Sequence, residues 1–203
     1  MSDAPTSADS GEAAETPDPL ALIDAGWRPE ELGWERLQER ALACAAAGNA
    51  AEAAGLWAEA LRLARAHFAD NDPRLATSLC NHAVGLSQGG DASAARRLVD
   101  EALRIWDASG PWVEALKPER RARSSTFHLR LQSKHPGGYD HFSHSRYAAL
   151  AAEGRDAILG FRARPDCDAE STAARLSHWR KDRPAGFTDG RKLMAAVRLM
   201  PAL

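Results

Sequence analysis

An internal repeat limits the possible folds of this chain more than any other feature. Shifted by 42 residues, the sequence places Leu37 on Leu79, Ala41 on Ala83 and Gly48 on Gly90. The same shift aligns the EALR run at 59–62 with the EALR run at 101–104. The matched residues are those that helical hairpins need, because glycine permits a tight turn and alanine lets two helices approach closely. A repeat of this length predicts stacked units that bury a continuous core.

Within each unit, apolar residues recur at the three- and four-residue spacing of an amphipathic helix. Trp34, Leu37 and Ala41 begin the first such face, and Ala53, Leu56 and similar residues continue the pattern to about Phe68. We therefore predict four helices in two hairpins over residues 34–117. Breaks rich in glycine, asparagine or proline separate them at 48–49, 71–73, 89–90 and 109–111.

These residues resemble tetratricopeptide repeats. The family pattern of a small residue in the first helix, a glycine at the turn and alanines in the second helix occurs twice, as Ala41…Gly48…Ala53…Ala60 and as Ala83…Gly90…Ala95…Ala102. The 42-residue spacing resembles the repeats of kinesin light chains and related bacterial proteins over about residues 34–107. The resemblance implies an all-α, short solenoid of stacked helical hairpins that acts in protein–protein recognition. It specifies a fold more closely than a function.

The rest of the chain divides by composition and charge. Residues 1–18 have five acids, no base and no large apolar side chain, so we expect a disordered acidic tail. Residues 19–33 predict a short helix followed by a turn at 29–32, which would cap the amino-terminal end. Residues 118–160 predict a degenerate third hairpin with its first helix at 121–134. Residues 161–203 predict capping helices, begun by Asp168 or Ser171 and by Thr188, because a solenoid needs its open ends covered.

The resemblance also indicates where a partner would bind. Tetratricopeptide stacks usually bind a peptide in the concave groove lined by the first helix of each hairpin. Asn81 is the leading candidate, because its amide offers both donors and an acceptor to an extended peptide; a surface or inter-helix polar role is the alternative. The side chains expected to face the groove are Gln38, Leu42, Ala45, Thr77, Asn81, Val84 and Gln88.

A basic stripe lies beyond the two clear repeats. Residues 118–203 carry 16 bases and 9 acids, whereas residues 21–117 carry 10 bases and 14 acids. Arg120 and Arg123, with Arg130 and Lys134, recur at helical spacing and could receive an acidic peptide, a carboxylate or a phosphate. The protein's own acidic tail and plain solvation are the other interpretations. Nucleic-acid binding is not favoured, because the stripe is short and has few aromatic residues.

A histidine-rich segment supplies a competing hypothesis. His141 and His144 would share a helix face near His135 and Asp140, so a metal- or phosphate-binding module centred on residues 118–146 is the alternative function. No HExxH motif, cysteine pair or second carboxylate accompanies them, and a polar segment at a helix edge is the simpler interpretation. We therefore expect no cofactor.

Neither enzyme chemistry nor a membrane location is indicated. Ser124, Ser125 and His128 have no nucleophile elbow or acid partner, and no glycine pair precedes a Lys-Ser or Lys-Thr. The unpaired set of Cys44, Cys80 and Cys167 favours reduced thiols. Without a signal peptide or a long apolar run, the sequence predicts a cytoplasmic scaffold rather than an enzyme.

Overall fold

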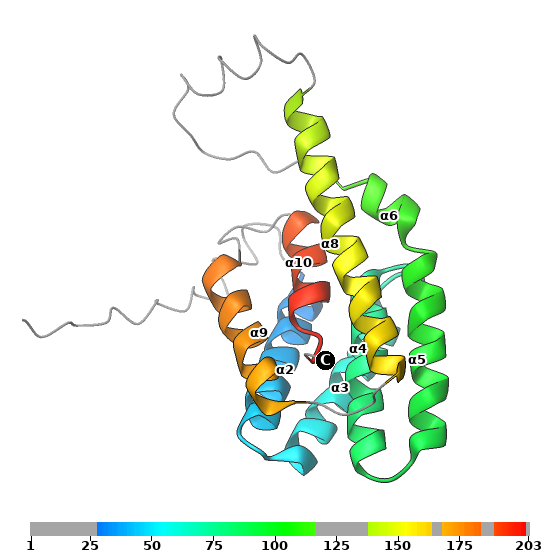
Figure 1. The fold of residues 1–203 in the computed structure, drawn as a ribbon, viewed down its shortest axis with the longest axis vertical. Coiled ribbons are helices and arrows are strands. Elements are labelled where there is room, and N and C mark those ends of the chain that lie inside the picture. The colour runs from blue at the N-terminus through cyan, green and yellow to red at the C-terminus, as the bar shows by residue number, and fades with distance from the viewer. Residues whose placement is uncertain (1–27, 117–137, 164–167, 184–188, 202–203) are drawn as a thin grey trace, which may run out of the picture.

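The computed structural model describes residues 28–116, 138–163, 168–183 and 189–201, with the backbone alone for 138–145 and for residue 189. Every regular element in these ranges is a helix, as the repeat pattern predicts. Figure 1 shows the helices as one packed bundle in which segments distant in sequence lie side by side. No helix in this part of the chain is both long enough and apolar enough to cross a membrane.

Two helical hairpins correspond to the two repeat units. The helices of the first are α2 (Pro29–Ala46) and α3 (Ala50–His67), and those of the second are α4 (Pro73–Gln88) and α5 (Ala92–Asp107). Gly48 and Gly90 join them with φ of 81° and 89°, in the left-handed region that glycine enters without steric cost. Each helix packs against the next in the chain. The four predicted helices are therefore confirmed.

Helix α2 begins earlier than the sequence suggested. The predicted turn at residues 29–32 is its first helical turn, with Pro29 at the first helical position. Proline suits that position because its fixed φ is helical and its missing N–H would have no partner there. Gly33 continues the helix, and a Cβ added to it would lie 3.5 Å from Leu63 on α3.

Helices α3 and α4 approach closely because their contact residues are small. A Cβ placed on Gly85 would lie 2.8 Å from the Cβ of Ala54, so only hydrogen fits at this point. Trp34 and Trp57 are fully buried, and Trp34 packs edge-on against Phe68 with ring centroids 5.7 Å apart. The hairpins thus share one core instead of meeting at a loose boundary.

After the short helix α6 (Gly110–Glu114), the chain forms the long helix α8 (Gly138–Ala163), which packs against α5. A Cβ on Gly154 would overlap the Trp106 ring, and the Trp106 indole N–H donates to the carbonyl of Ala151 at 2.9 Å. The predicted first helix of the third hairpin, 121–134, lies outside the described residues. The second half of that predicted hairpin is part of α8, which continues to Ala163.

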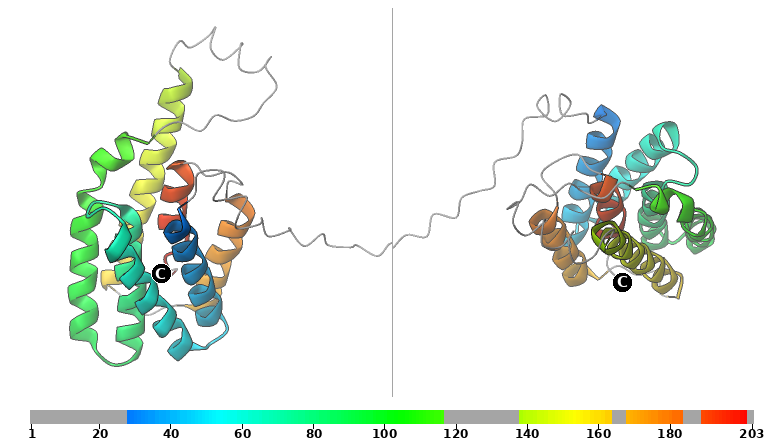
Figure 2. Two further views of the ribbon diagram at one scale, coloured as in Figure 1. Left: turned by 180° about the vertical axis from the view of Figure 1, so that it is seen from behind. Right: turned by 90° about the horizontal axis from the view of Figure 1, so that it is seen from above.

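The last two helices occupy a different place from the one predicted. Asp168 caps α9 (Ala169–Asp182), its carboxylate accepting from the Ser171 N–H at 2.7 Å, as expected for a cap. However, α9 packs on α2, and α10 (Asp189–Arg198) packs on α4, α8 and α9. Instead of extending the stack, these helices return to its first members. Figure 2 shows α10 enclosed among the other helices when the molecule is seen from above.

Candidate functional site

The face of α2 and α4 that was predicted to line an open groove lies in the interior of the protein. Five of the predicted residues have no exposed surface: Gln38, Leu42, Thr77, Asn81 and Val84. Ala45 is partly buried, and Gln88 is exposed at the end of α4. We call Gln38, Thr77, Asn81 and Val84 the α2/α4 face. The expectation that this face is open to solvent is wrong, because α10 and the residues after it pack on α4, and α9 packs on α2.

Burial of apolar surface explains why α10 lies there. Leu193, Val197 and Leu199 are fully buried and Met200 is nearly so. Burying a side chain of this kind contributes about 1.5–3 kcal/mol relative to leaving it in water. A ten-residue helix is too short to be stable alone, so the apolar face of α10 requires a surface such as the α2/α4 face.

Polar side chains of α4 and α9 bind the main chain of α10 and of Leu199, the residue that follows it. The Thr77 hydroxyl donates to the carbonyl of Ala196 at 2.6 Å, and the Asn81 amide donates to the carbonyl of Leu199 at 2.8 Å. The guanidinium of Arg175, from α9, donates to the carbonyl of Val197 at 3.0 Å. The last carbonyls of a helix have no partner within the helix. The site therefore caps the carboxyl-terminal turn of α10 with two side-chain donors and holds the carbonyl of Leu199 with a third.

Asn81 is only half satisfied by this arrangement. Its amide nitrogen also donates to the Gln38 side-chain oxygen at 2.7 Å, and Gln38 in turn donates to the Ser78 hydroxyl at 3.2 Å. The Asn81 side-chain oxygen is buried and accepts no hydrogen bond from any atom that the structure describes. A buried acceptor without a donor is costly. With α10 bound, the Asn81 amide nitrogen is thus hydrogen-bonded, whereas the side-chain oxygen of the same residue is not.

Acidic residues form a row along α2 at every fourth position, and we call Glu31, Glu35 and Glu39 the acidic row. Lys192 lies 3.5 Å from Glu31, and Arg191 pairs with Glu35 at 2.7 Å. Glu39 pairs with Arg183 at 2.9 Å and also accepts from the Trp179 indole N–H. Each acid of the row therefore meets a base or donor of the carboxyl-terminal segment.

The pKa values of the two buried carboxylates of the row are shifted in opposite directions. For Glu31, burial by itself raises the pKa, but the charges of Arg74, Lys192 and Arg28 together hold it below its usual range. For Glu35, burial is the dominant effect and raises the pKa, although Arg191 opposes it. Glu35 thus depends on Arg191 more than on any other base, whereas Glu31 also has Arg74 at 3.1 Å.

The sequence pattern predicts only part of this row. Glu35 and Glu39 lie mostly away from the apolar face that begins with Trp34, Leu37 and Ala41, which favours a position in solvent, but the Glu35 side chain is only 9% exposed. The available signals were the four-residue spacing of the acids and the excess of bases after residue 118. A further signal is the position of Arg191 and Lys192 in the first turn of α10, where the helix dipole disfavours positive charge.

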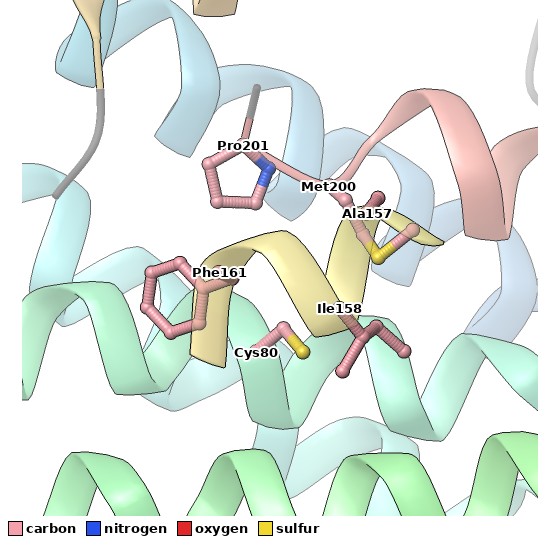
Figure 3. Close-up of a pocket in the computed structure, with 6 residues that line it drawn as sticks. All are labelled: Cys80, Ala157, Ile158, Phe161, Met200 and Pro201. Carbon is pink, nitrogen blue, oxygen red and sulfur yellow. The ribbon is translucent and has the colours of Figure 1, made fainter. Parts of the chain in front are cut away.

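We call residues 189–201, which comprise α10 and the three residues after it, the docked segment. A buried thiol lies under the end of this segment. Figure 3 shows Cys80 of α4 beneath Met200 and Pro201, with α8 residues Ala157, Ile158 and Phe161 around it. The enclosed space is about 10 Å³, room for at most a single water. Burial raises the pKa of Cys80 to about 12, so the thiol is protonated and unreactive while covered.

The remaining predicted site residues, apart from Gln88, lie outside the described side chains. Arg120, Arg123 and His135 lie outside the described residues, as do Arg130, Lys134 and Cys167. Asp140, His141 and His144 are on α8 where only the backbone is described. Among the side chains that are described, no cluster of three or more potential metal ligands occurs.

Comparison with known proteins returned no matching family model, no matching curated protein and no matching solved structure.

Proposed function

We propose that this chain is a tetratricopeptide-type scaffold that binds a segment of a partner protein on the α2/α4 face. In this proposal α2 to α5 form two repeats, and α8 takes the place of the first helix of a third repeat, although the sequence pattern assigns it to the second half of the third hairpin. The first helices of the repeats, α2, α4 and α8, then form the concave side. In this proposal α10 occupies the site where a partner segment would bind.

The chemistry of Asn81 is the observation that carries the proposal. Its amide holds a main-chain carbonyl of the occupant, and its buried oxygen has no donor from the described atoms. An extended peptide would supply a carbonyl and an N–H to the same side chain, and so would satisfy both ends of the amide. Thr77, one turn away, supplies a second donor to the main chain. Donors aimed at a main chain favour recognition of a peptide segment over a small molecule.

The test requires a full chain in which α10 is held less tightly. Arg191→Gln removes the partner of Glu35 and leaves every residue of the α2/α4 face unchanged. A random peptide library is selected on this variant, and the enriched peptides are measured against three further chains. These add Asn81→Leu, Thr77→Val or the control Glu59→Ala, which changes an exposed residue of α3.

We expect enriched peptides to lose about tenfold or more in affinity with Asn81→Leu, since removing a buried hydrogen-bonding group costs about 1–3 kcal/mol. Thr77→Val should weaken them as well, and Glu59→Ala should leave them unchanged. Circular dichroism of each variant verifies that helicity is kept. Selection of no peptide, or of peptides insensitive to both Asn81→Leu and Thr77→Val, would contradict the proposed function.

A further inference from the structure

We infer that the partner segment recognised by the α2/α4 face is basic, with two adjacent cationic side chains at the start of an amphipathic stretch. This inference rests on the proposed function and specifies its ligand. It differs from the sequence-based expectation of an acidic partner, which was drawn from the arginines at 120–134.

The acidic row provides the charge complement. Glu31 and Glu35 border the α2/α4 face one helical turn apart, and both are nearly inaccessible to solvent. Ionised carboxylates in such a place need cationic partners, because leaving one unpaired is strongly destabilising. An acidic or neutral segment could replace the apolar contacts of α10, but it would leave Glu35 without a base.

The docked segment shows which pattern satisfies the row. Arg191 makes two contacts with the Glu35 carboxylate, at 2.7 and 3.3 Å, and Lys192 lies beside Glu31. The guanidinium of Arg191 also lies 5.6 Å from the Trp179 ring centroid, a cation–π distance. Leu193, Val197 and Leu199 then follow with the apolar contacts. The site therefore combines charge selection at one end with main-chain recognition at the other.

The position of the bases within α10 is an independent argument. Positive charge in the first turn of a helix opposes the helix dipole, so Arg191 and Lys192 do not favour the helix itself. Their pairing with Glu35 and Glu31 compensates for this. A partner segment that displaces α10 must therefore supply two bases of its own to Glu35 and Glu31.

The test uses the full-length Arg191→Gln chain and three labelled peptides. The first has the sequence of residues 189–203, the second has Gln at the positions of Arg191 and Lys192, and the third has Glu at both. Fluorescence anisotropy gives the affinity of each. We expect the basic peptide to bind at least about tenfold more tightly than the neutral peptide, because one close ion pair is gained, and the acidic peptide to bind least.

A double substitution checks that Glu35 makes this selection. In the Glu35→Gln/Arg191→Gln chain, which has neither charge of that pair, the preference for the basic over the neutral peptide should fall by about tenfold, to the part that Glu31 supplies through the lysine, while circular dichroism confirms the fold. Equal binding of the three peptides to the Arg191→Gln chain, or tighter binding of the acidic one, would overturn the inference and leave the proposed function standing. Failure of every peptide to bind a folded chain would count against both.

Discussion

Arg74 joins the first turns of α2 and α4 by direct ionic contacts. Its guanidinium lies 2.7 Å from Asp72 and 3.1 Å from Glu31, and it stacks 4.0 Å from the centroid of the Phe68 ring. All three charged groups are buried. Asp72 also caps α4 by accepting from the Arg74 N–H at 2.9 Å. One side chain thus connects the cap of α4, the acidic row and the core.

Replacement of Arg74 by alanine should therefore be strongly destabilising. It would leave two buried carboxylates short of their main partner, for which about 3–5 kcal/mol is typical. Urea unfolding followed by circular dichroism measures the loss. Arg62→Ala is the matched control, because Arg62 is 74% exposed and 4.0 Å from Glu59, and such surface pairs contribute about 0–1 kcal/mol. Equal effects of the two substitutions would contradict a central role for Arg74.

Cys80 provides a natural probe of the docked segment. With its pKa at about 12 and Met200 and Pro201 above it, the thiol should react with alkylating reagents only when its cover opens. In a Cys44→Ser/Cys167→Ser chain at pH 8, we expect Arg191→Gln to speed alkylation of Cys80 by about tenfold or more, since it breaks a buried pair.

Cys44 supplies the control for this measurement. It is partly buried near the end of α2 and does not line the space beside Met200 and Cys80. In a Cys80→Ser/Cys167→Ser chain, its alkylation rate should be the same with and without Arg191→Gln. If both thiols accelerate together, Arg191→Gln acts by loosening the whole fold, and the specific link between Cys80 and α10 is wrong.

Helix packing in the repeats can be tested with two glycines that both lie within helices but have different neighbours. Gly55 of α3 has open space where a Cβ would be, so Gly55→Ala should stabilise the protein by about 0.5–1 kcal/mol through helix propensity. At Gly85 of α4, the added Cβ would lie 2.8 Å from Ala54, so Gly85→Ala should cost about 1–3 kcal/mol from overpacking. Thermal unfolding of both variants shows the opposite shifts. Shifts of the same sign would contradict the close approach of α3 and α4.

The same elements show how far sequence reasoning reaches. Helices α2 to α5 could be predicted because their signals are local: the apolar period, the caps and Gly48 and Gly90 at the turns. The position of α10 could not, because Thr77 meets Ala196 across 119 residues and Glu35 meets Arg191 across 156. The resemblance to tetratricopeptide repeats places Gln38 and Asn81 on one shared face, and their side chains are hydrogen-bonded to each other. That this face is covered depends on a long-range contact that no periodicity encodes.

Across the whole molecule, charge is arranged so that an acidic repeat region receives a basic carboxyl-terminal region. The net charge is −4 for residues 21–117 and +7 for residues 118–203. Contacts between the two parts include Arg155 with Asp107, Arg162 with Asp100 and Arg183 with Glu39, which are exposed or half-buried. Such pairs weaken with salt, whereas the buried Glu35–Arg191 pair is screened much less. Salt alone should therefore loosen the periphery of the interface more than its centre.

This arrangement predicts that α10 opens as a unit separate from the repeats. It is ten residues long, and its attachment includes a few apolar side chains, side-chain donors to the carbonyls of Ala196 and Val197, and the charged pairs of Arg191, Lys192 and Arg198, whereas α3 and α4 pack against neighbours on both sides. Native-state hydrogen exchange should then show amides at 193–198 exchanging through a smaller opening free energy than those at 75–84. Arg191→Gln should speed exchange in α10 by on the order of a hundredfold, because a broken buried pair costs about 3–5 kcal/mol, and should leave α4 protected by its own helical hydrogen bonds. If α4 and α10 exchange together in both chains, α10 is a fixed part of a single cooperative core and could not leave the α2/α4 face to a partner without unfolding the protein.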